Sequence, residues 1–139
     1  MQIEEVVEKL RNYNALKMQI KKLKMKADIL AEDITELPAL ACSERVQTSN
    51  TRKVVEENTL KLIQEKSIVE NRIKKKEDEL KVIELGVSEL PYYERKIIQL
   101  RYFYKCSWRE CEEQLGYSER YLQKIRKKAL EDLKVFFEL

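Results

Sequence analysis

Histidine is absent from this chain of 139 residues, and the absence excludes much of ordinary enzyme chemistry. Without histidine there is no Ser–His or Cys–His nucleophilic pair and no histidine-containing zinc site, and the commonest general base is missing. The three cysteines, Cys42, Cys106 and Cys111, are odd in number and have no paired spacing, which argues against disulfides and fits a reducing compartment. We therefore expect no enzymatic activity, no bound metal and no cofactor.

Glycine and proline are almost as scarce, with two of each. A sheet-rich fold needs turn residues about every ten positions, so the composition predicts an all-α protein. Charged residues make up 38% of the chain, which is typical of long helices whose surface faces water. No apolar run approaches about eighteen residues and no basic-then-apolar leader opens the chain, so we expect a cytoplasmic protein without a membrane partner.

Apolar residues in the first quarter of the chain have the spacing of a narrow helical seam. From Ile3 to Leu37 they recur in steps that alternate between three and four, which predicts one helix over about 2–36. Two successive steps of three around Tyr13 break the heptad phase. Pro38 disfavours helical geometry at the residue before it and is expected to end this helix.

A second helix is predicted over about 51–85, after a loop at 38–50 that is rich in Pro, Ser, Thr and Asn. Thr59, Lys66 and Lys76 weaken its seam, and Gly86 is a suitable residue to end it. Two helices of similar length predict a long, coiled-coil-like antiparallel hairpin over 1–86. Because a narrow seam buries little area, we expect this segment to self-associate into a homo-oligomer; the alternative is that it folds back onto the C-terminal domain.

Residues 87–139 have the pattern of a helix-turn-helix domain. Ser88 and Pro91 begin a helix that reaches about Tyr104. The sequence Ser107-Trp108-Arg109-Glu110 is a capping box, which begins a short helix, and Ser118 can cap the helix that follows. The positions that pack the two helices or form the left-handed turn are then Cys111, Leu115, Gly116, Tyr117, Leu122 and Ile125. Glu112 departs from the pattern, since a small residue normally stands there.

Positive charge is concentrated in the last helix, although the net charge of the chain is only +3. A basic helix alone is more often a solvated surface, but together with the capping box and the glycine turn it favours binding of double-stranded DNA. The first turns of such a helix face base edges in the major groove, where arginine pairs with guanine and glutamine with adenine. The predicted base contacts are Ser118, Glu119, Arg120 and Gln123. The predicted phosphate contacts are Arg109, Lys124, Lys127 and Lys128.

The motifs LPYYERKIIQLRYF, SWRECEEQLGYSER and KALEDL of residues 88–134 resemble region four of bacterial sigma factors. They are more similar still to phage late-gene regulators of the ArpU and RinA type, whereas residues 1–87 share only the helical architecture. The resemblance implies a transcriptional activator of late bacteriophage genes that contacts host RNA polymerase. It places the DNA-reading part at residues 117–120 and the basic helix after them. Glu112 departs from the family too, which usually has alanine there.

Two other functions compete with a transcription regulator. A small terminase subunit also joins a helix-turn-helix to helical oligomerisation segments, but usually carries the DNA-binding domain first. A coiled-coil adaptor would bind protein through residues 88–139. In either a regulator or an adaptor, the apolar tail of residues 135–139 lies outside the helix-turn-helix core, and we expect it to be free to contact a partner such as the polymerase. The alternative is that Phe136 and Phe137 cover the core between the first and last helices of their own domain.

Overall fold

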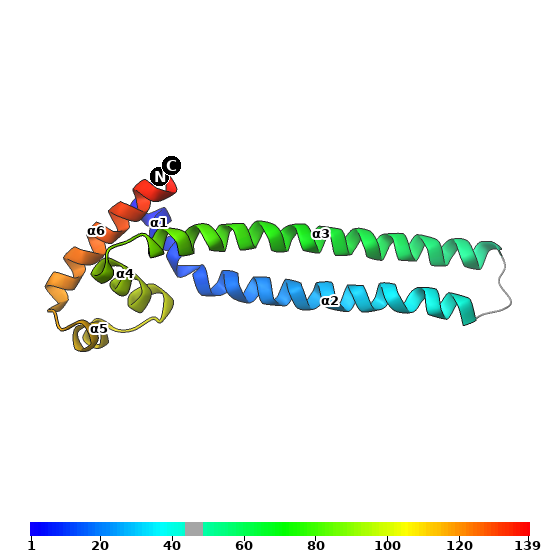
Figure 1. Cartoon of the computed structure of the whole chain (residues 1–139), viewed down its shortest axis with the longest axis horizontal. Coiled ribbons are helices and arrows are strands. Elements are labelled where there is room, and N and C mark those ends of the chain that lie inside the picture. The colour runs from blue at the N-terminus through cyan, green and yellow to red at the C-terminus, as the bar shows by residue number, and fades with distance from the viewer. Residues whose placement is uncertain (44–48) are drawn as a thin grey trace. The chain divides into compact units, whose positions relative to one another are not determined.

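The computed structural model describes the backbone of residues 1–43 and 49–139 and the side chains of residues 1–35 and 56–139. Every regular element in this part of the chain is a helix (Figure 1), which confirms the all-α prediction. None of the helices described is both long and apolar enough to cross a membrane. In chain order the elements are α1 (Ile3–Arg11), α2 (Tyr13–Ser43), α3 (Ser49–Ser88), α4 (Tyr92–Ile98), the π-helix η1 (Gln99–Phe103), α5 (Trp108–Leu115) and α6 (Glu119–Phe137).

The chain forms two compact units, one made of residues 1–17 and 78–139 and the other of residues 18–77. This division differs from the boundary between residues 86 and 87 that the sequence suggests. The reason is that α1 packs with the C-terminal helices, where it contacts α6 and η1. Its side chains Val6 and Leu10 are fully buried there. The unit that contains the helix-turn-helix segment therefore includes the first helix of the chain.

The predicted N-terminal seam faces the interior along its described length. Its members are buried at Val6, Leu10, Tyr13, Leu16, Ile20, Ala27 and Leu30, and half-buried at Ile3, Leu23 and Ile34.

Two details of the predicted first helix are wrong. The helix is interrupted at Asn12, between α1 and α2, next to the two steps of three in the seam. It also does not stop before Pro38, since α2 continues to Ser43. A proline inside a helix removes one backbone hydrogen bond and crowds the carbonyl four residues earlier, at a cost of about 3 kcal/mol, which weakens a helix without always ending it.

In the unit of residues 18–77, α2 and α3 lie side by side (Figure 1). Polar contacts join the two helices where the Lys76 ammonium lies 2.9 Å from the Gln19 amide oxygen and where Lys24 lies 2.8 Å from the Glu77 carboxylate. Between the helices is a small apolar core formed by Ala27, Leu30 and Val69, with Leu23, Leu62 and Ile73 packed against it.

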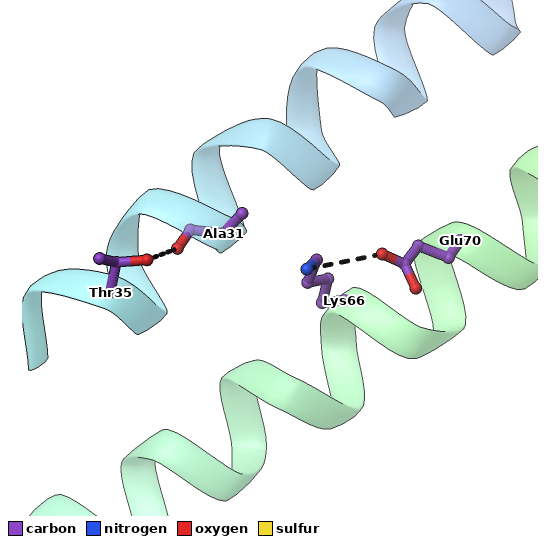
Figure 2. A network of polar contacts seen from close by, with 4 residues as sticks. All are labelled: Ala31, Thr35, Lys66 and Glu70. Carbon is purple, nitrogen blue, oxygen red and sulfur yellow. Dashed lines mark hydrogen bonds and ion pairs between the residues drawn. The ribbon is translucent and has the colours of Figure 1, made fainter. Parts of the chain in front are cut away.

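Lys66 is one of the residues expected to weaken the apolar seam of α3. It is half-buried, and its ammonium pairs with an acidic residue of the same helix. Its ammonium lies 3.6 Å from the carboxylate of Glu70 (Figure 2). Thr35 of α2 likewise donates to the Ala31 carbonyl at 2.8 Å, one turn earlier in the same helix (Figure 2). A long polar side chain can thus lay its apolar stem along the seam while its charged end reaches a partner near water.

Gly86 does not end the second helix, as the sequence suggested, because α3 continues to Ser88. A Cβ atom at position 86 would lie 2.9 Å from Cδ1 of Phe136 and 3.2 Å from Cδ2 of Leu133. Glycine is therefore required here for the close approach of α6 and not for a turn.

The C-terminal residues Phe136, Phe137 and Glu138 contact other parts of the chain. Helix α6 runs to Phe137, whose ring lies 5.0 Å from the Lys9 ammonium, and Phe136 faces Gly86. The Glu138 carboxylate lies 3.2 Å from the N-terminal ammonium of Met1. The expectation of a free apolar tail over 135–139 is wrong for these residues, although Val135 and Leu139 are exposed.

Glu94 of α4 is a buried acid, with 5% of its surface exposed, and its Oε1 has no hydrogen-bond partner. Burial, and next a hydrogen bond with Asp132 of α6, raise the pKa of Glu94 from 4.5 to about 7, while nearby Lys128 acts in the opposite direction. The folded protein therefore holds a proton on Glu94 over a range in which the unfolded chain has released it.

This raised pKa makes the stability of the protein depend on pH. Between pH 4.5 and about 7 the folded state binds more protons than the unfolded state, so the free energy of unfolding falls as pH rises through this window. We expect Glu94→Gln to flatten this dependence and to stabilise the protein at pH 8 by about 2 kcal/mol. Denaturant titrations at pH 5 and pH 8 measure both effects, with exposed Glu89→Gln as the control. Equal pH dependence in the two variants would contradict this role of Glu94.

Candidate nucleic-acid interface

The two helices of the predicted helix-turn-helix begin and end where their capping residues indicate. The Ser107 hydroxyl accepts a hydrogen bond from the Glu110 amide at 3.2 Å at the start of α5. Gly116 ends α5 in the left-handed conformation, with φ 75° and ψ 18°. The Ser118 hydroxyl then accepts from the Tyr121 amide at 3.4 Å and begins α6. The local chemistry of these residues therefore fixes where α6 begins.

The capping box is only half formed. Burial, and next a hydrogen bond with the Glu110 carboxylate, raise the pKa of the Cys106 thiol. Of the two bonds of a complete box, the described residues show the one from the Glu110 amide to the Ser107 hydroxyl. Cys106 and Cys111 are both free thiols, and burial raises the pKa of Cys111 as well.

Most of the predicted core positions are in the core. Cys111 and Leu122 are fully buried, and Leu115 and Ile125 are half-buried. Tyr117 is the exception, since 38% of its surface is exposed. A tyrosine has an apolar ring and a polar tip, so it can cover the edge of a core and still face water.

Glu112 has a definite structural role, which explains how this departure from the usual pattern is tolerated. Its Oε1 accepts a hydrogen bond from the Glu119 amide at 2.6 Å. The first amides of a helix lack partners within the helix, and a carboxylate near them is favourable. Glu112 therefore ties α5 to the beginning of α6 and places negative charge there.

The predicted contact residues on α6 lie on its exposed side. Gln123 and Glu119 are brought together, since the Gln123 amide donates to the Glu119 carboxylate at 3.0 Å. In the described part of the chain no carboxylate pairs with Arg120, Lys124 or Lys127. All the predicted contacts on or just before α6 are exposed, namely Ser118, Glu119, Arg120, Gln123, Lys124, Lys127 and Lys128.

Two of the predicted phosphate contacts have acidic neighbours. Arg109 lies 3.8 Å from Glu113, one turn along α5, but both side chains are largely exposed, at 89% and 69%. Such a pair contributes little and is easily exchanged for a phosphate. Lys128 is close enough to Glu94 to lower the pKa of that carboxyl.

Sequence reasoning missed a cluster of exposed tyrosines beside the start of α6. The ring of Tyr93 contacts those of Tyr92 and Tyr117, with centroids 5.2 Å apart in each case, and Tyr117 contacts Tyr121 at 4.8 Å. A hydrogen bond with Tyr93 is the first cause that raises the pKa of the Tyr117 hydroxyl. The spacing of four between Tyr117 and Tyr121 was the only sequence signal for this cluster. Its hydroxyl groups add donors and acceptors next to the cationic side of α6.

The exposed groups at this site are the cations of Arg120, Lys124 and Lys127, the Gln123 amide, tyrosine hydroxyls and the carboxylates of Glu113 and Glu119. No family model, curated protein or solved structure matches this chain.

Proposed function

We propose that this protein is a sequence-specific, double-stranded DNA-binding transcription regulator. In this proposal α5 and α6 form a helix-turn-helix like that of sigma region four, and α6 enters the major groove. The observation that supports this proposal is that α6 is amphipathic, with one buried apolar side and one exposed polar side. Leu122, Ala129 and Leu133 are buried on one side, while Arg120, Gln123, Lys124 and Lys127 are exposed. The major groove of B-DNA admits a single α-helix.

The contacts divide into base readers and phosphate binders. Ser118, Glu119, Arg120 and Gln123 stand in or before the first turns of α6, which in this motif reach base edges. To read adenine, Gln123 must give up its hydrogen bond to Glu119, whose carboxylate then accepts from cytosine or water. Arg109, Lys124, Lys127 and Lys128 bind phosphates and set the register of the protein on the duplex.

The resemblance to ArpU- and RinA-type regulators supports a more specific role, as an activator of late bacteriophage genes that acts with host RNA polymerase. Its motifs cover the helix-turn-helix segment, and this part of the proposal depends on that resemblance alone.

Self-association through the antiparallel hairpin of residues 1–86 belongs to the same proposal. It is supported by large apolar side chains that are exposed on α3, among them Leu60 at 58% and Ile63 at 47%. Exposed apolar patches commonly mark association surfaces. Light scattering at micromolar concentration should show a dimeric or larger full chain, and Leu60→Lys with Ile63→Lys should shift it toward the monomer. A monomeric wild-type chain would remove this part of the proposal.

Arg120 provides the test of sequence-specific binding. We expect Arg120→Ala to weaken binding to a site selected from random DNA by about 1–3 kcal/mol and to relax the base preference at one position. Random-sequence DNA should be bound with a much smaller loss. Binding isotherms on both DNAs measure this difference, and exposed Arg72→Ala on α3 is the control for loss of one positive charge. Equal losses on the two DNAs would mean that Arg120 contacts only phosphate.

A further inference from the structure

A cavity of about 270 Å³ in the unit of residues 1–17 and 78–139 is lined almost entirely by positive charge. None of its lining residues is among the proposed DNA contacts. No carboxylate of the described side chains pairs with any of its cations. The lining residues are Arg11 of α1, Arg101 and Tyr102 of η1, Lys105 of the following loop, and Arg126 of α6.

Two of these cations are fixed in place by the same indole ring. The guanidinium carbons of Arg101 and Arg126 lie 4.4 Å and 5.5 Å from the ring centroid of Trp108. Arg101 also donates to the Cys106 carbonyl at 2.8 Å. Like charges held close together and away from carboxylates repel each other, and the repulsion is strongest where water is partly excluded. An anion between them would relieve it.

Two buried polar atoms among the lining residues have no hydrogen-bond partner, the Tyr102 hydroxyl and Nε of Arg126. Tyr102 is nine-tenths buried, with 7% of its surface exposed. Buried polar groups are nearly always bonded in native proteins, and an exception calls for a water, an ion or a function. Both atoms can donate a hydrogen bond, and both belong to residues that line the cavity.

The backbone around the cavity is irregular in a way that the predicted continuous helix to Tyr104 did not include. Gln99–Phe103 is a π-helix, in which the Tyr104 amide donates to the Gln99 carbonyl at 2.9 Å. Lys105 follows with a φ of 53°, which is uncommon for a residue with a side chain. Single-turn π-helices occur frequently at functional sites. Here the irregular turn places Arg101, Tyr102 and Lys105 around one space.

We propose that this cavity binds a phosphate-class oxyanion. Guanidinium groups match phosphate oxygens in geometry and charge, which suits Arg101 and Arg126, and the Tyr102 hydroxyl donates a further hydrogen bond. Arg11 and Lys105 complete the neutralisation. Pockets for drug-sized ligands begin at roughly 300 Å³, so this cavity fits one phosphoryl group or a small phosphorylated compound. The phosphoryl group can come from a DNA backbone or from a free small molecule. The proposal does not depend on the proposed function.

Calorimetric titration of the full chain with inorganic phosphate at low ionic strength tests the site. We expect the wild-type chain to bind one equivalent of phosphate saturably. The double variant Arg11→Gln/Lys105→Asn should bind phosphate at least about tenfold more weakly, because each lost charge-assisted contact reduces the affinity severalfold. Neither replaced side chain makes a hydrogen bond within the described residues, and asparagine tolerates the positive φ at position 105. The control, Lys74→Gln/Lys75→Gln on α3, removes the same charge and should bind phosphate as the wild type does. Unsaturable binding, or equal weakening in the control, would overturn the proposal.

Tyr102→Phe separates a binding role from a structural one. Because it removes an unpartnered hydroxyl, we expect an unchanged or higher melting temperature without phosphate and a smaller increase when phosphate is added. A lower melting temperature with an unchanged phosphate response would remove Tyr102 from the site.

Competition with a random-sequence duplex then identifies the source of the phosphoryl group. Displacement of phosphate by DNA supports a backbone phosphate, and simultaneous binding supports a free small molecule. Saturable phosphate binding without any DNA binding would overturn the proposed function and leave this site intact.

Discussion

Replacing Lys124, Lys127 and Lys128 together by alanine is expected to weaken binding to DNA of any sequence by about 100-fold or more at 0.1 M salt. All three side chains are exposed on α6, and their loss leaves the buried side of the helix at Leu122 and Leu133 unchanged. Each phosphate contact releases about 0.9 counterion from B-DNA, so the slope of log affinity against log salt should become shallower by nearly three. Binding isotherms at four salt concentrations measure that slope.

A variant of equal charge separates this effect from bulk electrostatics. Lys74, Lys75 and Lys81 are exposed on α3, and replacing all three by alanine lowers the net charge by the same amount. We expect this control to keep most of the salt slope. The double variant Lys124→Ala/Lys127→Ala leaves Lys128, which lies near Glu94, and should retain roughly one unit of slope more than the triple variant. Identical slopes for the triple variant and the control would contradict the placement of α6 in the groove.

The features that could be predicted from the sequence are those that depend on local chemistry. The capping serines Ser107 and Ser118 and the left-handed Gly116 define α5 and α6 through contacts within a few residues. The apolar seams of the helices could also be predicted, because buried residues on one side of a helix recur in the sequence with the period of the helix. Val6, Leu10 and Val69 are buried as that period indicates.

The sequence predictions that were wrong or missing concern contacts between segments that are distant along the chain. Gly86 looked like the end of a helix, and only the position of Phe136, fifty residues later, shows that it permits close packing. The spacing of the helix-turn-helix places Tyr117 in the core, and it does not indicate the contact of its ring with Tyr93. The basic cavity brings together Arg11, Arg101 and Arg126 from three separate elements. No single window of the sequence contains these neighbours.

Gly86→Leu is expected to lower the free energy of unfolding by about 2–3 kcal/mol, although leucine is intrinsically the better helix former by nearly 1 kcal/mol. The loss comes from the ring of Phe136, whose Cδ1 lies 2.9 Å from where a Cβ would stand. Lys81→Leu, at an exposed position of the same helix, is the control and should change stability by less than about 0.5 kcal/mol.

A double-mutant cycle tests the cause of this loss. Phe136→Ala alone is expected to destabilise the protein by about 2–3 kcal/mol, because the ring is half-buried between α3 and α6. In that background the leucine at position 86 can occupy the space that the ring leaves, so Gly86→Leu should become nearly neutral. The expected coupling energy is about 2 kcal/mol, and it is measured by denaturant titration of the four proteins. Additive losses would show that Gly86 is needed for some reason other than the approach of Phe136.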